Sequence, residues 1–298
     1  MITVLWVMTV AGIVATAGAL AGRNAVNAAT NRAHLERAFW TAMGCVARVE
    51  SAIDATLAAA RTYDEAADTW RVLERAALPL SNVAAAECTI GLEAAGTRLD
   101  VNEASEEMLR NTFVALGYGN DAESLVAALA DWRDSDSVAR PLGAERDWYL
   151  AARRDAPRNA PLADIRELAR VRGFENPTVF DSVLTTEPGR VSLATAPVTV
   201  LLAVPGFTRE TAEEIVALQR AGTPIADVTS ILGLVSRASA DSIRARYPDI
   251  ARVTTPDPDA WILNVRATIG APPVSVTLAR RLLRDAKRAV VAGSRSAP

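Results

Sequence analysis

The chain has 298 residues, 50% of them hydrophobic and 22% charged, and its formal net charge is −3. These values exclude a chain disordered by composition and a strongly basic nucleic-acid-binding protein. The length suffices for one large domain or two modest ones. The only histidine, His34, has polar helical neighbours and is expected at the surface. With one histidine and no Walker, GxGxxG or HExxH motif, the sequence predicts no enzyme.

The first 22 residues, MITVLWVMTVAGIVATAGALAG, carry no charge. A helix needs about 20 apolar residues to cross a hydrocarbon core of ~30 Å. A cleaved secretory signal is the alternative, because Ala17, Ala19 and Ala21 permit an A-x-A cleavage site. Such a signal normally has a basic region before its apolar run, and none is present here. We therefore expect a retained membrane anchor.

The helical pattern continues past this segment, because no proline occurs from Arg23 to about Tyr63. Apolar side chains recur there at spacings of three and four, the period of one helix face. They are Phe39, Met43, Val46, Val49, Ile53 and Leu57. The sequence thus predicts one long helix, apolar first and amphipathic later. Its apolar face is expected to carry a sheet and to contact partner helices through Phe39, Met43, Val46 and Ile53.

Two separated regions have strand patterns. Residues 88–92 and 99–101 flank a turn and predict a β-hairpin. Near the C-terminus, strands are predicted at Trp261–Thr268 and Val274–Leu278, and a third at Ala289–Ala292. The sequence therefore predicts an α+β fold, in which a long N-terminal helix packs on a small antiparallel sheet and a large all-α domain is inserted between strands.

This fold divides the chain into four predicted parts. Residues 1–22 form the apolar half of the helix, and 23–101 hold its amphipathic half and the first hairpin. Residues 102–250 form the inserted helical domain, and 251–298 return as strands. Helical periodicity with Gly-, Pro- and Asp-rich loops predicts five helices in the insertion. They are Glu106–Leu116, Ala122–Trp132, Leu162–Val171, Arg209–Arg220 and Ser239–Tyr247.

The insertion contains a faint internal repeat. LDVNEASEEMLRNTFVALGYG, from Leu99, overlays VSLATAPVTVLLAVPGFTRETAEEI, from Val191. Each copy reads as a strand end, then a helix that starts at a Ser or Pro, and then a glycine turn. A chance likeness between two helical hairpins is the alternative.

The stretch ADWRDSDSVARPLGAERDWYL, residues 130–150, is rich in acids. Asp131, Asp134 and Asp136 follow one another closely, and Glu145 returns after Pro141 and Gly143. Calcium takes six to eight oxygen ligands, mostly from carboxylates and carbonyls. These four acids therefore predict a calcium site.

Two alternatives remain open for this loop. Arg133 and Arg140 offer ion pairs that would make the acids a salt-bridged structural turn. A glycosidase-like carboxylate pair would need a substrate cleft, for which Trp132, Trp148 and Tyr149 are the candidate walls. At their spacing, however, these aromatic residues are expected to anchor the loop to the helical core.

Several stretches, in this order along the chain, resemble the minor pseudopilin K family of type II secretion systems, also called general secretion pathway protein K. They are TVLWVM, LDVNEAS, ADWRDSD with GAERDWY, APRNAPLADIRELARVRGF and VSLATAPVTVLLAVPGF. Two features depart from the family pattern: no basic leader is seen before the apolar segment in this sequence, and Ala194 occupies a position where the family has asparagine. No glutamate occurs in the apolar segment, as expected for the K subunit among pilins.

The resemblance implies a pilin-like protein at the tip of a periplasmic pseudopilus. It implies assembly with the I and J minor pseudopilins and the major pseudopilin, contact with secreted cargo, and a single pass through the inner membrane. It also implies calcium in the helical insertion, and no nucleic acid.

A rival hypothesis is a membrane-anchored helix-hairpin-helix protein that binds DNA in a competence-type uptake system. VPGFTRETAEEIVALQRAG resembles such an element. Its turn has only Gly206, and arginines and acids balance between Pro205 and Tyr247. A neutral surface gains little from counterion release, which supplies most non-specific DNA affinity. The stretch is therefore better interpreted as a structural hairpin.

The two cysteines, Cys45 and Cys88, lie outside any CxxC motif. One pair fits a single disulfide in an oxidising compartment or two inert buried thiols. A disulfide would join the long helix to the first strand.

Overall fold

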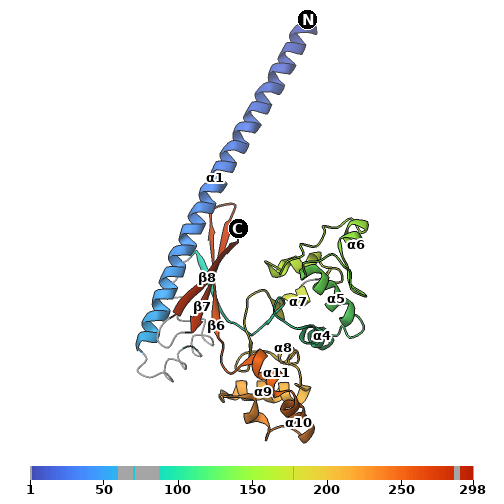
Figure 1. Ribbon diagram of the computed structural model, residues 1–298. Helices are drawn as coiled ribbons and strands as arrows, with labels where there is room; N and C mark the ends of the chain where they lie inside the picture. Colours follow the sequence, from blue (N-terminus) through green and yellow to red (C-terminus); the bar gives the residue numbers. More distant parts are fainter. Residues whose placement is uncertain (1, 60–69, 71–86, 177, 285–288, 298) are drawn as a thin grey trace. The chain divides into compact units, whose positions relative to one another are not determined.

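The computed structural model describes residues 2–59, 70, 87–176, 178–284 and 289–297. The chain divides into two compact units (Figure 1). The first comprises Met1–Leu92 and Ile262–Pro298, and the second comprises Glu93–Trp261. A mainly helical segment is thus inserted between strands, and the predicted fold class is confirmed. The inserted unit extends beyond the predicted 102–250 at both ends, because short strands near its ends pair inside it.

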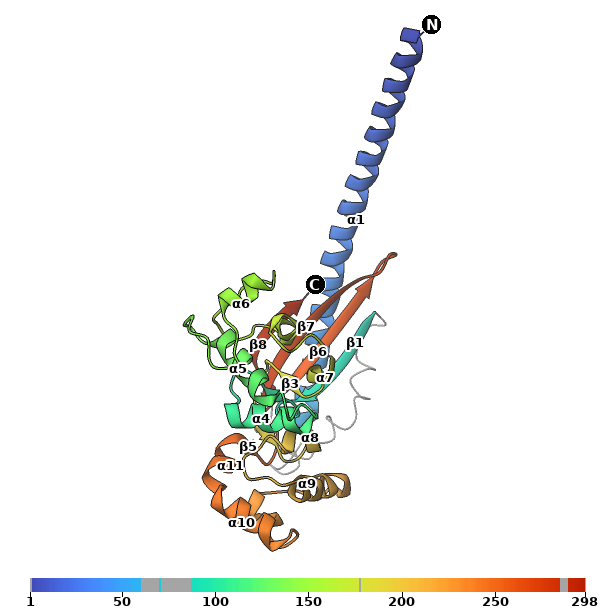
Figure 2. The same cartoon turned by 90° about the vertical axis from the view of Figure 1, so that its right-hand side faces the viewer.

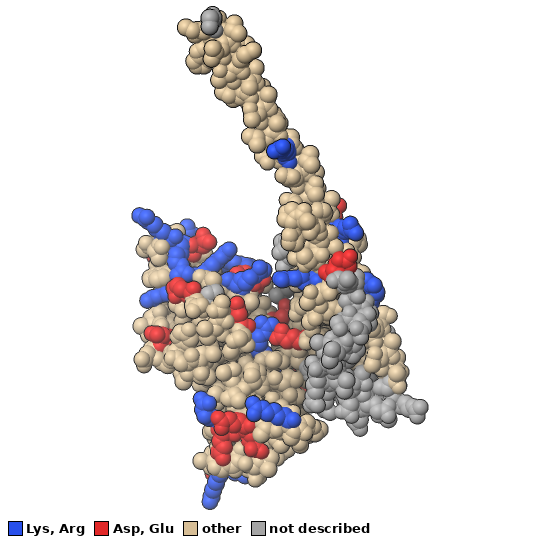
Figure 3. Space-filling view, turned by 180° about the vertical axis from the view of Figure 1, so that it is seen from behind, with Lys and Arg blue, Asp and Glu red and all other residues tan. Residues whose placement is uncertain are grey.

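The long helix α1 (Ile2–Ala59) runs without a break for 58 residues. Its first half is apolar and exposed, and Figure 3 shows an almost uncharged surface there. Its second half buries one face, which contains Ala38, Ala42, Cys45, Val46, Val49, Ile53 and Leu57. The predicted helix and most of its predicted apolar face are therefore confirmed.

The buried face of α1 lies on a four-stranded sheet (Figure 2). The strand order is β1 (Cys88–Ala94), β6 (Ala260–Ile269), β7 (Val274–Arg284), β8 (Ala289–Ala297). Strands β7 and β8 are antiparallel, with Leu278 opposite Ser296. All three strands predicted near the C-terminus are present, and each is longer than its apolar pattern indicated.

His34 is half-buried, which corrects the expectation of a surface histidine. A Cβ atom at Gly270, in the β6–β7 turn, would lie 2.4 Å from His34 Nδ1. The ring therefore packs against this turn, and the turn needs a residue without a side chain.

The predicted hairpin of residues 88–92 with 99–101 is wrong. β1 pairs with β6, whereas β2 (Leu99–Asp100) pairs in parallel with β3 (Leu184–Thr185) in the second unit. At the turn between them, Gly96 has φ +82°, and its carbonyl accepts a hydrogen bond from the Ser192 N–H at 3.1 Å. The turn thus packs against a distant segment, and the chain leaves the sheet there. The alternation of apolar and polar residues predicts a strand, but it does not predict which other strand pairs with it.

The second unit is built from short helices around one core. Its helices are α4 (Glu106–Ala115), α5 (Ala122–Arg133), α6 (Arg146–Ala151), η1 (Ile165–Arg170), α7 (Thr178–Asp181), α8 (Val198–Leu201), α9 (Arg209–Ala221), η2 (Val228–Ile231), α10 (Arg237–Ala245) and α11 (Tyr247–Val253). The five predicted helices are present, although the one predicted at 162–171 is the 3-10 helix η1. A second parallel strand pair joins β4 (Val191–Ser192) to β5 (Thr254–Thr255).

The faint sequence repeat has a structural counterpart. β2, α4 and α5 form one copy, and β4, α8 and α9 form the other. In each copy a side chain near the end of the second helix donates to the carbonyl that follows the strand. Arg133 donates to the Val101 carbonyl, and Gln219 donates to the Leu193 carbonyl at 2.9 Å. A side chain near the end of the second helix thus makes a similar hydrogen bond in each copy, which favours a true repeat over a chance likeness.

Candidate metal site in the acidic loop

Two helix ends position the acidic loop. Asp131 lies in the last turn of α5, and Asp134 is the residue that ends this helix. Glu145 is the N-cap of α6, and its side chain accepts from the Arg146 N–H at 3.2 Å. The loop between these ends returns the chain and brings its two acidic flanks together.

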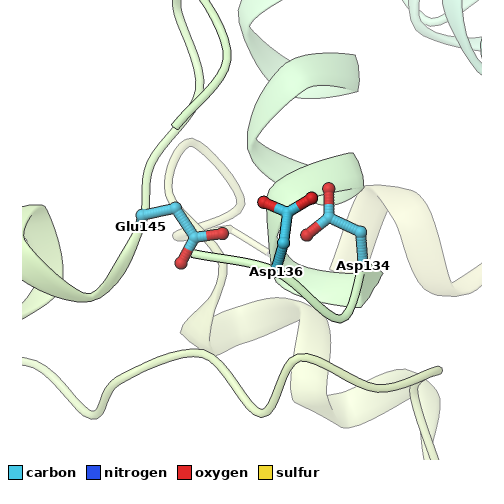
Figure 4. Close-up of side chains that lie close together, drawn as sticks. All are labelled: Asp134, Asp136 and Glu145. Atoms are coloured by element: carbon cyan, nitrogen blue, oxygen red, sulfur yellow. The ribbon is translucent and has the colours of Figure 1, made fainter. Parts of the chain in front are cut away.

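The carboxylate oxygens of Asp134, Asp136 and Glu145 lie within 4.8 Å of one another. Figure 4 shows Asp134 and Asp136 side by side, with Glu145 directed toward them from the returning chain. The structure thus brings together three of the four predicted calcium ligands. We call this group the acidic cluster.

Asp131 lies outside the acidic cluster, contrary to the prediction. Its side chain is fully buried and accepts from the Arg140 backbone N–H at 3.2 Å. A Cβ atom at Gly143 would lie 2.1 Å from Asp131 Oδ2, so the loop backbone approaches this carboxylate closely. Asp131 therefore holds the loop backbone. A carboxylate on the last helical turn reaches nearby backbone N–H groups as readily as it reaches a shared ion.

Two oxygens of the acidic cluster have no hydrogen-bond donor in the described structure. They are Glu145 Oε1 and Asp134 Oδ1, and both atoms are buried. Glu145 is only 5% exposed. An unsatisfied buried polar atom costs about 1–3 kcal/mol, and more when it is charged. A hard cation would satisfy both oxygens.

The pKa values of the clustered carboxyl groups are consistent with their burial and their closeness to one another. Burial raises the pKa of Glu145, and the charges of Asp131, Asp134 and Asp136 raise it further. Burial raises the pKa of Asp134, and the charge of Asp136 adds to the rise. The fold therefore disfavours the ionised cluster when no ion is bound, and a divalent cation would offset this effect.

The arginines divide between two roles. The Arg133 side chain turns away from the acidic cluster and donates to the Val101 and Asn102 carbonyls. Arg140 contacts the edge of the cluster, with its Nη2 3.6 Å from Asp134 Oδ2. The alternative of a salt-bridged structural turn therefore accounts for only one oxygen of Asp134, the one that faces Arg140. Among the described residues, Glu145 makes no ion pair.

Aromatic residues anchor the loop to the core, as predicted. Trp132 and Tyr149 are buried, with ring centroids 5.3 Å apart. The Tyr149 hydroxyl accepts from the Arg172 N–H at 3.0 Å, and the Arg172 guanidinium donates to the Gly143 carbonyl at 2.9 Å. These rings pack on one another and on the core, so they do not serve as the walls of a sugar cleft.

Asn159 also holds the loop, although it was not among the predicted site residues. Its side-chain amide donates to the Asp136 carbonyl and ties the loop to a segment 23 residues away. Asn159 has φ +51°, a left-handed conformation that asparagine tolerates better than most residues. The asparagine between Arg158 and Ala160 was a weak signal, because its partner lies far away in the sequence.

The face predicted to meet partner helices is largely covered by the chain's own sheet. Val46 is 1% exposed and Ile53 is fully buried, whereas Phe39 and Met43 are half-buried. Val46 and Ile53 therefore pack inside this chain. On the same helix, Cys45 forms a disulfide with Cys88, with their Sγ atoms 2.18 Å apart.

Comparison with protein families matches residues 80–181 to type II secretion system (T2SS), protein K. This segment belongs to the protein K family. It extends from before β1 to the end of α7 and contains the whole acidic loop. The resemblance found in the sequence is thereby confirmed.

The fold also matches a chain in the crystal structure of the GspK-GspI-GspJ complex from the enterotoxigenic Escherichia coli type 2 secretion system. The TM-score is 0.62 at 17% identity, and the match covers 91% of this chain and 99% of that chain. At this identity the likeness shows a shared fold. A search of curated protein sequences finds no match.

Proposed function

We propose that the chain is the K-type minor pseudopilin of a type II secretion system and acts as a non-enzymatic subunit at the tip of the pseudopilus. The protein K match over residues 80–181 carries this proposal. The long helix, the small sheet and the inserted helical unit support it, because the same fold occurs in a chain of the GspK-GspI-GspJ complex. The comparisons favour this function over DNA binding.

We also propose a single pass through the inner membrane, with most of the chain in the periplasm. The start of α1 is long and apolar enough to cross a membrane. Its large side chains are exposed, with Trp6 and Met8 at 68% and 73% exposure. The Cys45–Cys88 disulfide suits an oxidising compartment such as the periplasm.

The proposed partners are the I- and J-type minor pseudopilins, the major pseudopilin and secreted cargo. The similar fold in the Escherichia coli structure occurs in a GspK-GspI-GspJ complex, which supports the first two partners. The full chain, tagged and purified in detergent from cells that also produce its own I- and J-type subunits, is expected to retain both through a high-salt wash. A tagged single-pass periplasmic protein that is unrelated serves as the control, and it should retain the two subunits only at background level. If this chain loses both subunits in the wash, the proposed assembly is contradicted.

For the acidic cluster we propose calcium as the ligand, held by Asp134, Asp136 and Glu145, with Asp131 fixing the loop. The clustered oxygens and the two oxygens without donors support this assignment. Hard oxygen ligands suit calcium, and carbonyls and water would complete the six to eight positions. The bound ion would let three ionised carboxylates share a small space.

Melting curves with calcium and with a chelator test the metal. At a free calcium concentration of a hundred times Kd, binding is expected to stabilise the wild type by about 2.7 kcal/mol. Asp134→Asn and Glu145→Gln are expected to lower the melting temperature in calcium far more than in chelator. Asp155→Asn, which removes an exposed carboxylate outside the cluster, serves as the matched control. Equal shifts in calcium and chelator would rule out calcium at this loop.

A further inference from the structure

Arg140 lies inside the acidic loop and contacts three acids. Its guanidinium pairs with Glu106, lies 3.5 Å from Asp131 Oδ1 through Nε, and lies 3.6 Å from Asp134 Oδ2 through Nη2. Its backbone N–H separately donates to Asp131. The main chain of this residue therefore fastens the loop, while its guanidinium lies within reach of three acids.

Asp134 belongs to two groups at once. Its Oδ2 faces Arg140, whereas its Oδ1 is buried without a donor. The same side chain lies in the acidic cluster with Asp136 and Glu145. A calcium ion in the acidic cluster and the Arg140 guanidinium would therefore both bind the carboxylate of Asp134.

We propose that Arg140 is an internal cation that competes with calcium for Asp134, and that it thereby sets the calcium affinity and holds the loop together when calcium is absent. This inference rests on the calcium site proposed above. A positive charge next to a ligand carboxylate opposes the arrival of a divalent cation by Coulomb repulsion. Glu106 and Asp131 give the guanidinium partners when calcium displaces it from Asp134, so its release leaves no unpaired charge.

A purely structural Arg140 makes a different prediction. If Arg140 only braced the loop, its removal would disorder the ligands and weaken calcium binding together with stability. A competing cation predicts opposite signs, because its removal weakens the calcium-free loop but leaves Asp134 wholly available to calcium.

The decisive variant is Arg140→Gln in the full chain purified in detergent. Glutamine keeps the backbone N–H that bonds Asp131, and it removes the positive charge together with the guanidinium contacts. Titration with calcium chloride in a calorimeter is expected to show binding roughly three- to tenfold tighter than the wild type. Melting in chelator is expected to show a lower melting temperature than the wild type. Arg140→Lys, which keeps the charge, should restore weaker binding.

Arg158→Gln is the matched control, because Arg158 also bridges to an acid, Glu167, at 2.9 Å and is similarly exposed. It should leave calcium affinity unchanged. Calcium binding to Arg140→Gln that is equal to or weaker than wild type would overturn the inference and leave the calcium site standing. A wild type that binds no calcium would overturn both.

A second measurement needs no charge-removing variant. In the wild type, the Arg140 Nε–H nuclear magnetic resonance signal, assigned by its loss in Arg140→Lys, is expected to shift when calcium is added. A signal that stays in place while calcium binds would contradict competition for Asp134.

Discussion

At the scale of single residues, the acidic loop depends on one close approach of backbone to carboxylate. Asp131 is fully buried, and the space beside its Oδ2 is taken by the backbone at Gly143. The Arg140 N–H donates to Asp131, and the Arg172 guanidinium donates to the carbonyl of Gly143 itself, so both bonds fix the backbone here. A side chain at position 143 must therefore move either the carboxylate or the loop.

Gly143→Ala is expected to lower the free energy of unfolding by about 1–3 kcal/mol, the usual cost of overpacking. It should also weaken calcium binding, because Glu145 follows two residues later. Gly119→Ala is the control, since its added Cβ meets nothing within 4 Å. Chemical denaturation of both variants and calcium titration provide the test. Wild-type stability and affinity in Gly143→Ala would show that the loop relaxes freely.

At the scale of elements, α1 is one continuous helix whose first half is exposed and apolar and whose second half packs on the sheet. Its exposed start lacks charge, and its later half is buried on the sheet through one face. The disulfide joins Cys45 on the buried face to Cys88 at the start of β1, across 43 residues of sequence. It therefore connects the helix to an edge strand of the sheet that the helix covers.

Removing this cross-link is expected to destabilise the first unit. The chain-entropy model assigns a loop of this length about 4 kcal/mol. Cys45→Ala with Cys88→Ala should lower stability to guanidinium by a comparable amount, whereas reducing agent should affect only the wild type. Intact mass under non-reducing conditions provides the direct check, and two free thiols in protein isolated from cells would contradict the bond.

At the scale of the whole molecule, the chain combines a helix-and-sheet unit with an inserted, mainly helical unit. Strands from both ends of the sequence form one sheet, so the inserted segment leaves and re-enters the first unit through β1 and β6. The candidate metal site lies wholly inside the second unit. Calcium removal is therefore expected to lower the stability of the second unit and to leave the packing of α1 against the sheet unchanged.

The proposed anchor makes a prediction for the entire protein. The chain isolated from cell membranes should retain the apolar segment, because that segment and the amphipathic half form one uninterrupted helix. N-terminal mass spectrometry of the extracted protein provides the measurement. A mature chain that begins near Gly22 or Arg23 would remove the anchor and the assembly role with it.

Much of the fold could be predicted from local patterns. The long helix follows from an unbroken run without proline, and the C-terminal strands follow from alternating residues such as those from Trp261. The acidic cluster was partly predictable, because Asp134, Asp136 and Glu145 flank a loop that Pro141 and Gly143 can reverse. The competing role of Arg140 and the bond from Asn159 were not, since both depend on how the loop closes.

By itself, the sequence determined which segments are helical, where the apolar anchor lies and which loop collects acids, because these depend on neighbours within a few residues. Only the tertiary structure decided that β1 pairs with β6 instead of Leu99–Asp100, that Asp131 holds the loop backbone, and that Val46 and Ile53 lie beneath the chain's own sheet. Strand pairing, carboxylate direction and burial depend on residues far apart in the chain. The free energy of each of these features comes from contacts between distant segments, and such contacts form only when the chain has folded.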